Sequence, residues 1–578
     1  MTALDTASPA RPAPAGPLGD LETPDPLELL LGDPTDPGNP VGYQAFVDAD
    51  EHGDFLPAGR KAMEAYGIGA EFVPTALGGR LVQADRLARV LRTVFRRDGA
   101  LGLGFGAINL IASSTVWAAG DQAQRRWLAD VLLGNGQTAG AITELAHGDD
   151  LARTRLTATP RGAELVLDGR KEVINNIARA HAITVLARTS TEPGNRSHSL
   201  LLVDPAAVPR DRLRFLPRFR TSGMRATHLG GVEFLECPVP ASAVVGEIGD
   251  AMETVLRCFQ VTKSVASSAM VGALDTMLRT VTDFTLRRRL YDRTVAELPH
   301  ARAQLTAAFT DLLVCDSLAT TVCRSLHVLP GQTSVYAAAA KYLVPMLAQN
   351  AADGLAVLLS ARSFLREGPH AVFQKHLRDL PVAALAHSGA TICQATMIPQ
   401  LPRLARKSWF SSAAPDPVLF RFGEPLPELD FGRLAAGAGP DDRLIATLPA
   451  ADLSGDPALR VLHGRLLEEL RAQKNGWTGL PPRNRTPFAG PVAFELAERY
   501  AVLLAAAACV GVWQHNQDHP SAFVRDPAWL VCALDRLTAR LGYDPVDGAR
   551  EAGHKVFAEL TARYAANTGF DLIGRRLC

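Results

Sequence analysis

One stretch, residues 141–189, constrains the fold of this chain more than any other. Its short β-prone runs, Leu165–Leu167 and Ala182–Leu186, alternate with turn signals at Pro160–Gly162 and Asp168–Gly169. Short apolar runs bounded by Gly, Asp and Pro predict antiparallel strands joined by tight turns. Almost everything before this stretch, and most of the chain after the strands, has the apolar spacing of helices. We therefore expect a small antiparallel sheet set between two long helical regions.

Length and composition narrow the possible classes. A chain of 578 residues can bury a large core and is expected to contain more than one domain. Because 60 basic residues balance 60 acidic ones, nothing in the charge favours nucleic acid as a partner. The 8 cysteines form no C-x-x-C pair, which indicates a reducing cytoplasm and neither a disulfide scaffold nor a zinc site. The first residues lack the pattern of a signal peptide.

Residues 101–120 carry no charge and are almost long enough to span a bilayer. Asn109, Ser113–Thr115 and several glycines interrupt the run, so a buried core helix is expected there. We therefore predict a soluble protein that makes no contact with a membrane.

Shifts of composition divide the chain into segments. The N-terminal tail is rich in Pro, Ala and Gly and is expected to be disordered, and a second Pro- and Gly-rich stretch indicates a linker. The predicted order is a tail at 1–24, an N-terminal helical domain at 25–140, a β domain at 141–250, a helical domain at 251–410, a linker at 411–442 and a C-terminal helical domain at 443–578. Helices are expected at 252–290, 299–326, 334–365 and 382–407 within the second helical domain.

Three motifs resemble the acyl-CoA dehydrogenase and acyl-CoA oxidase superfamily. Thr143-Glu144 followed by Gly148-Asp149-Asp150 is similar to T-E-x-x-x-G-S-D. Residues 168–176 resemble N-G-x-K-x-W-I-T-N, and residues 222–240 resemble the family's G-x-R-x-S motif with its following V-x-V-P. The resemblance implies a mostly helical fold with a central β domain, in which residues 251–410 form an antiparallel four-helix bundle. A further C-terminal helical domain is similar to the oxidase branch.

The resemblance also implies FAD as cofactor. Thr143 stands where the family binds the isoalloxazine ring, and Asn175 replaces the Thr that meets flavin N5. Arg288 resembles the Arg that reaches the FAD pyrophosphate of a neighbouring subunit, which implies a homo-oligomer, either a dimer or a tetramer. The family's Q-x-x-G-G loop, which holds the adenine end, is replaced by residues 356–360, AVLLS. A Leu side chain fills room that Gly leaves to a cofactor, so we expect FAD to be weakly bound or lost.

On the substrate side the resemblance implies an acyl thioester carried by CoA or by an acyl carrier protein. Asp149, Thr262 and Lys263 fall at the family's substrate-contacting positions. The family's catalytic base is a Glu, and neither of its two positions carries a carboxylate here. One position holds Thr262, ten residues before Gly272, and the other holds His387. His387 is the candidate base, and a hydrogen-bonded structural His is the alternative.

Three functions therefore stay open. The first is a flavin-dependent dehydrogenase or oxidase of acyl thioesters with a non-standard base. The second is a flavin monooxygenase or N-oxygenase of the same fold, and the third is a cofactor-free enzyme or scaffold that has lost FAD. No metal site is expected, because His515, Asp518 and His519 are followed at once by Pro520, which favours a loop.

Overall fold

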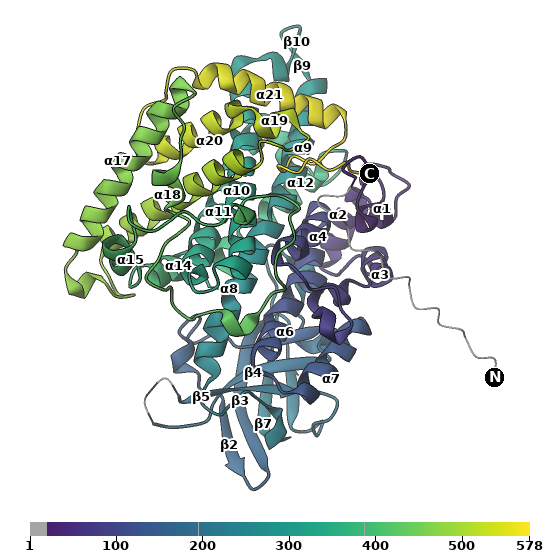
Figure 1. The fold of residues 1–578 in the computed structure, drawn as a ribbon. Helices are drawn as coiled ribbons and strands as arrows, with labels where there is room; N and C mark the ends of the chain where they lie inside the picture. Colours follow the sequence, from purple (N-terminus) through teal and green to yellow (C-terminus); the bar gives the residue numbers. More distant parts are fainter. Residues whose placement is uncertain (1–19, 193, 195, 387) are drawn as a thin grey trace.

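The computed structural model describes residues 20–192, 194, 196–386 and 388–578. Figure 1 shows a mostly helical molecule with a sheet at one end, the N-terminal helices beside it and the C-terminal helices over the bundle. The predicted fold class is thereby confirmed. The N-terminal helices are α1 (Pro26–Leu31), α2 (Tyr43–His52), α3 (Pro57–Tyr66), α4 (Ala84–Arg97), α5 (Gly99–Leu101), a π-helical turn (Gly102–Ala107), α6 (Ile108–Ala119) and α7 (Gln122–Leu133).

The sheet contains β1 (Thr138–Ala141), β2 (Thr157–Arg161), β3 (Glu164–Ile174), β4 (Ala182–Arg188), β5 (His198–Val203), β6 (Leu213–Leu216), β7 (Gly230–Pro240) and β8 (Val244–Val245). Its order is β6-β7-β3-β2-β4-β5-β8, with β1 beside β4. The prediction of a purely antiparallel sheet is wrong, because β1 and β2 both run parallel to β4. A long loop, residues 142–156, joins β1 to β2 in place of a hairpin, so no tight turn forces the two strands to run in opposite directions.

The bundle consists of α8 (Ala251–Ala269), α9 (Val271–Arg287), α10 (Pro299–Val328) and α11 (Thr333–Leu359). Residues 252–290, expected as one helix, are divided at Met270. Just beyond the break, a Cβ on Gly272 would lie 2.3 Å from the carbonyl oxygen of Arg92, so glycine lets α9 pack closely on α4. A short two-stranded hairpin, β9 (Arg289–Leu290) and β10 (Arg293–Thr294), then leads to α10.

The prediction of one helix over 382–407 is wrong. After α12 (Ala371–Asp379) the chain forms α13 (Val382–Leu385), α14 (Ala390–Met397) and α15 (Leu401–Lys407). The breaks come at Gly389 and at Pro399, which cannot donate a helical hydrogen bond. At the first break, Ala386, Ser388 and Gly389 lie outside both helices, directly before α14.

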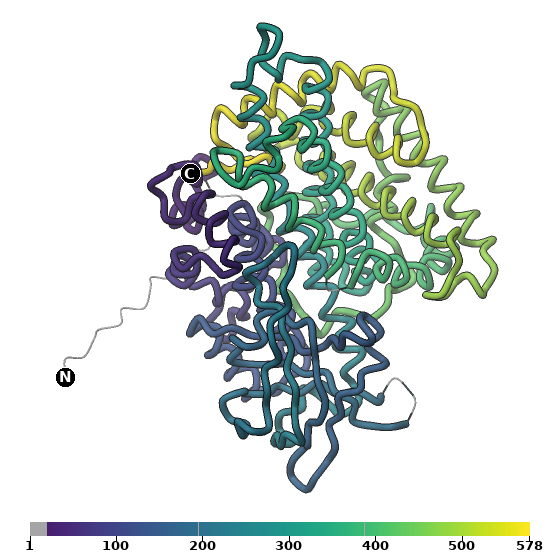
Figure 2. The backbone as a smooth tube through the Cα atoms, turned by 180° about the vertical axis from the view of Figure 1, so that it is seen from behind, coloured from purple at the N-terminus to yellow at the C-terminus, as the bar shows by residue number. Residues whose placement is uncertain are grey.

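The C-terminal helices cover the bundle (Figure 2). They are α16 (Thr447–Ala450), α17 (Pro457–Gly479), α18 (Pro491–His515), α19 (Ala522–Arg525), α20 (Pro527–Arg540) and α21 (Ala549–Ala565). The middle of α18 is buried against α10 and α11. The segment at 411–442 is packed as well, since Phe420 and Phe431 are buried and Asp442 accepts hydrogen bonds from Trp409 and Tyr500.

The two ends of the described chain meet. The backbone N–H of Arg576 donates to the carbonyl of Leu21 at 2.9 Å, and Arg575 donates to the carbonyl of Asp20 at 2.7 Å. Within the tail predicted to be disordered, residues 20–24 are therefore held against the C-terminus. Residues 1–19 lie outside the described part.

Within the described part of the chain, four helical stretches are long and apolar enough to cross a membrane by length and composition alone. In Gly99–Ala119 and Pro299–Val328, 89% of the apolar window is buried inside the protein, and in Pro491–His515 78% is buried. In Thr333–Phe364 the buried share is 50%. The stretch at 101–120 thus lies in the core, as the sequence predicts.

Candidate functional site

The site lies where the β domain meets the bundle. Two loops distant in sequence come together there: residues 142–156 after β1, and residues 386–389 before α14. The Asp149 carboxylate accepts a hydrogen bond from the backbone N–H of Gly389 at 3.2 Å. This contact joins the predicted substrate-contacting residue Asp149 to the loop that carries position 387. His387 itself lies outside the described residues.

A buried ion pair fixes the first of these loops. Glu144 accepts hydrogen bonds from the backbone N–H groups of Arg155 (2.9 Å) and Leu156 (3.1 Å), and it lies 3.0 Å from Lys171 Nζ. Burial alone would raise the pKa of Glu144, but the charge of Lys171 and the backbone donors lower it. Burial lowers the pKa of Lys171 to about 8 although Glu144 opposes the shift. The pair ties the loop to β3.

The residues assigned to the flavin ring gather at the end of β3. The Thr143 carbonyl accepts from the backbone N–H of Glu172 at 3.2 Å, so Thr143 adjoins a β-bulge between Glu172 and Ile174. Val173, in that bulge, has φ +61°, a conformation that a β-branched residue rarely adopts. The half-buried Asn175 amide has no hydrogen bond to any residue that the structure describes. A hydroxyl and a free amide thus flank the bulge, which fits the polar edge of an isoalloxazine ring.

The residues assigned to the adenine end fit less well. At the end of α11, Leu359 is fully buried and Ser360 has φ +57°, where the family places two glycines. Val357 is 69% exposed. Arg288, at the end of α9, is exposed, and its guanidinium has no partner within the described chain. The site therefore fits the ring end of a flavin and lacks the close backbone approach at the adenine end.

Two buried lysines lie on the substrate side. Lys263 is 6% exposed, and its ammonium makes no hydrogen bond or ion pair with a described residue. Lys341, 4% exposed, donates to the carbonyls of Ala386 (2.9 Å) and Ala383. The predicted residue Thr262 is buried beside Lys263 in α8, and its hydroxyl donates to the carbonyl of Phe259 at 3.1 Å. Lys341 thus contacts the segment before α14, and Lys263 is near enough for the charges of Cys393 and Asp149 to act on it.

Burial dominates the electrostatics of this lysine pair. It lowers the pKa of Lys341 to about 8, a shift that the Cys393 thiol and Asp149 oppose and that Lys263 increases. Burial likewise lowers the pKa of Lys263, again against Cys393 and Asp149. Burial raises the pKa of the Cys393 thiol, which lies 3.6 Å from the carbonyl oxygen of Ser388. Within the described chain, neither ammonium has a carboxylate at ion-pair distance.

The sequence prediction missed Lys341 and Cys393. The available signal was weak: Lys341 is a single charge within the apolar run 334–347. Lysine is rarely fully buried, so a single Lys in an apolar helix is a signal by which a candidate functional residue can be found in a sequence. Cys393 carries no signal of its own.

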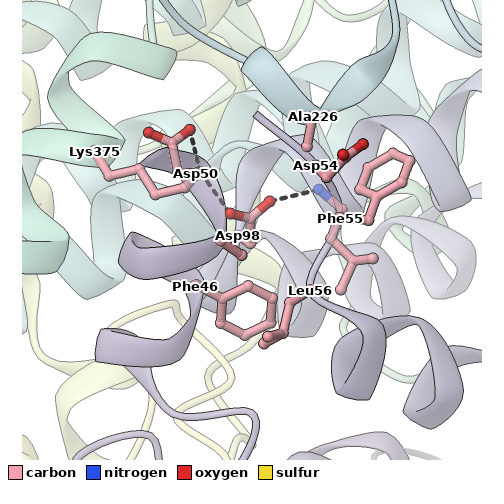
Figure 3. Close-up of a pocket in the computed structure, with 10 residues that line it drawn as sticks. Phe46, Asp50, Asp54, Phe55, Leu56, Asp98, Ala226 and Lys375 are labelled. Carbon is pink, nitrogen blue, oxygen red and sulfur yellow. Dashed lines mark hydrogen bonds and ion pairs between the residues drawn. The ribbon is translucent and has the colours of Figure 1, made fainter. Parts of the chain in front are cut away.

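A second cluster lines a small cavity between the N-terminal helices and α12 (Figure 3). The cavity measures about 10 Å³, close to the minimum for one water molecule. Lys375 pairs there with Asp98 (2.5 Å) and Asp379 (2.8 Å), while Phe46 and Leu56 line another side. The Lys375 ion pairs join the N-terminal helices to α12, and the cavity is too small for a substrate.

No group of metal-ligating side chains occurs among residues 20–578 as far as they are described. His515 stacks on Phe420, with ring centroids 5.5 Å apart, and His519 is buried in the turn after α18. The two histidines therefore serve packing.

Two family models and several known proteins are similar to this chain. Residues 139–237 match the model of the acyl-CoA dehydrogenase middle domain, and residues 250–399 match that of the C-terminal domain. The mitochondrial isovaleryl-CoA dehydrogenase of Bos taurus is 22% identical over 320 residues, which are 53% of this chain and 71% of that protein. An acyl-CoA dehydrogenase of Emericella nidulans is 25% identical, and the match spans 49% of this chain and 65% of that protein.

Among solved structures, the acyl-CoA dehydrogenase of Geobacillus kaustophilus is similar with a TM-score of 0.56 at 22% identity, covering 62% of this chain and 93% of that one. The prolyl acyl carrier protein oxidase AnaB is similar with a TM-score of 0.55 at 16% identity, covering 61% and 92%. These similarities establish the fold. Together with the two family models and the motifs at 143–150, 168–176 and 222–240, they identify the chain as a member of the acyl-CoA dehydrogenase superfamily.

Proposed function

We propose that this chain is an oxidoreductase that dehydrogenates an acyl thioester bound between the Asp149 loop and the loop at 386–389. One observation carries the proposal. Two buried ammonium groups, Lys263 and Lys341, approach this junction without a carboxylate partner among the described residues. A buried charge costs several kcal/mol unless it is compensated, so its presence beside a predicted substrate loop indicates a functional role.

The lysines supply what α-proton removal requires. When a base takes the α-proton of a thioester, negative charge develops on the α-carbon and the carbonyl oxygen. Fixed positive charge in a site of low dielectric constant stabilises that charge in the transition state. Lys341 also donates to the carbonyls of Ala383 and Ala386, which fixes the chain at the end of α13.

FAD is the proposed cofactor, and when bound it would accept the hydride from the β-carbon. Thr143 and Asn175 would hold its ring at the bulge of β3, and Arg288 would reach the FAD of a neighbouring subunit. His387 is the proposed base, since the family resemblance aligns it with the position of the catalytic Glu. An imidazole in its neutral form can accept the α-proton.

The test measures flavin content and bleaching. Purified protein reconstituted with FAD should be yellow, and an anaerobic acyl thioester should bleach it. His387→Ala should slow this bleaching by roughly 10²- to 10⁴-fold, and His387→Glu should retain it. A yellow protein that only an external reductant bleaches would favour a monooxygenase and overturn the dehydrogenase.

A second candidate is a family member without FAD. The buried Leu359 and the left-handed Ser360 at the adenine end favour it, because a missing contact surface and one or two lost hydrogen bonds could cost about 2–5 kcal/mol of binding. A colourless protein that takes up no FAD from solution would support this candidate.

We also propose a homo-oligomer in the cytoplasm. Exposed apolar side chains gather where α9 and α11 end: Tyr291 (87% exposed), Val357, Phe364 (83%) and Leu365. Arg362, in the short helix after α11, stacks on Phe284 of α9 and joins the two ends. The cysteines form no disulfide in the described chain, which suits a reducing compartment. A monomeric mass at micromolar concentration would contradict the oligomer.

A further inference from the structure

A basic hollow opens on the outside of the β domain. It has a volume of about 490 Å³ and is lined by His147, Ala152, Arg153, Thr154, Arg155 and Arg188. Most of these residues belong to the loop at 142–156, whose Asp149 contacts Gly389 of the bundle. His147 precedes Asp149 by two residues, so the hollow adjoins the entrance to the proposed site.

The positive charge of this hollow is only partly compensated. Arg188 donates to the carbonyls of Thr154 (3.1 Å) and Ala152 (2.7 Å), which fixes its guanidinium without neutralising it. The exposed side chain of Arg155 has no partner within the part of the chain that the structure describes. Arg153 lies 3.2 Å from Asp150, but this pair is 74% and 55% exposed and therefore weak. The Asp149 carboxylate is occupied by Gly389.

The lining selects among anionic ligands. Guanidinium groups bind carboxylates and phosphates through paired hydrogen bonds. An adenine nucleotide also needs an apolar or aromatic surface on which its base can stack, and among the described residues of the lining Ala152 is the only apolar one. Spaced arginines on an open surface instead complement the acidic side chains of a protein. The charges therefore fit an acidic protein surface better than a nucleotide.

We propose that this hollow docks the acidic face of a small carrier protein, which delivers the acyl thioester on a phosphopantetheine arm. The inference rests on the proposed function, because it names the carrier of that substrate. The arm would enter between Asp149 and Gly389, beside the hollow.

The test compares carrier binding and thioester turnover in the full-length protein. The two carriers used as probes are the phosphopantetheinylated acyl carrier protein of a bacterial fatty-acid synthase, and CoA. Each carrier is tested without an acyl group and with the same acyl group attached. Titration followed by fluorescence anisotropy should give saturable carrier binding that weakens as salt rises, since exposed charges are screened. The double variant Arg153→Glu/Arg155→Glu should weaken it by roughly 10- to 100-fold.

Arg161→Glu is the matched control. Arg161 is exposed on the same domain, at the end of β2, and lies outside the hollow. Its charge reversal should leave carrier binding within about twofold of the parent. Arg188 is left unchanged because it holds the loop.

The outcomes separate the docking from the chemistry. Carrier binding that depends on Arg153 and Arg155 supports the docking. If such binding is found but no thioester is oxidised, the docking is supported and the proposed oxidation is contradicted. Equal binding by the double variant and the control overturns the docking. No carrier binding at about 1 mM also overturns it, whether or not acyl-CoA is oxidised.

Discussion

Lys375 and Lys341 are both buried in the helical part of the molecule, yet their surroundings are opposite. Lys375 contacts Asp98 and Asp379, and the neighbouring Arg378 contacts Asp50 at 2.7 Å. Although burial opposes it, the charge of these carboxylates raises the pKa of Lys375. Among the described residues, the Lys341 ammonium donates to backbone carbonyls and not to a carboxylate, and burial lowers its pKa to about 8. Beside it, the ammonium of Lys263 has no partner within the described chain.

This difference indicates a structural role for Lys375 and suits the functional role proposed for Lys341. A buried cation that is paired and hydrogen-bonded can join two domains at little net cost, and Lys375 joins the N-terminal helices to α12 in this way. Lys263 and Lys341 have no carboxylate at ion-pair distance among the described residues, although the charge of Asp149 acts on both, and such buried charge lowers the stability of the fold. The chain retains them at the loop before α14, where a developing negative charge would use them.

The largest effect is expected from breaking the paired cluster. Lys375→Met should lower the free energy of unfolding by about 3–5 kcal/mol, because Asp98 and Asp379 would stay buried without their cation. Urea denaturation of the parent and the variant measures it. A loss below about 1 kcal/mol would mean that the cluster is solvated and that Lys375 does not differ from Lys341 in the way inferred.

Lys263→Met should have the opposite signature. Removing an uncompensated buried charge should leave the free energy of unfolding unchanged or raise it. Oxidation of the acyl thioester should slow by about 10- to 100-fold, since a positive charge near the reacting carbonyl is lost. Lys263→Arg, which keeps the charge, is the control and should lose less. A variant that is destabilised but fully active would assign Lys263 to structure.

The sequence alone predicted the overall fold and the segments that surround the candidate site. Glycines, prolines and apolar spacing predicted the bundle helices and the β domain, because these signals are local. The breaks at Met270 and Gly389 were missed, since the close packing of α9 on α4 at Gly272 and the contact of Asp149 with Gly389 depend on distant residues. The parallel strands were missed for a similar reason: strand direction is set by the path of a long loop.

Residues of the candidate site were predicted only where they fall within a motif of the family. Asp149, Thr262 and Lys263 came from the family resemblance, and Asp149 and Lys263 do lie toward the same loop. No spacing rule places Lys341 beside residues 383–386, because the two segments are adjacent only after α11 packs against α13 and α14. The difference from the family at the loop for the adenine end of FAD, in contrast, could be predicted from the missing glycines alone.

The pH dependence of stability should reveal Lys341. Its pKa is lowered to about 8 in the folded protein against about 10.5 in an unfolded chain, so the unfolded state binds more protons between these values. Stability contributed by this group therefore rises with pH across that window. The charges of Asp149, Cys393 and Lys263 also act on the Lys341 ammonium.

Comparison with Lys341→Met removes the contribution of other groups. From pH 7.5 to 9.5 the parent should gain about 2 kcal/mol relative to the variant, measured by urea denaturation at each pH. If the difference between parent and variant does not change with pH, Lys341 titrates as an exposed lysine does and is not an uncompensated charge.

The smallest effect is expected at Asp149, a carboxylate whose charge acts on both lysines. Asp149→Asn keeps an oxygen that can accept from Gly389 but removes the negative charge. Because Asp149 is exposed and its charge is screened, the free energy of unfolding should fall by less than about 1 kcal/mol at pH 7. The loss should vanish at about 1 M salt, where the Debye length is near 3 Å. Asp149→Ala, which also removes the acceptor, should retain a loss of about 0.5–1.5 kcal/mol at that salt concentration. A salt-resistant loss above about 2 kcal/mol in the Asn variant would show that Asp149 acts as a true counter-charge, and the lysine pair would then be compensated like Lys375.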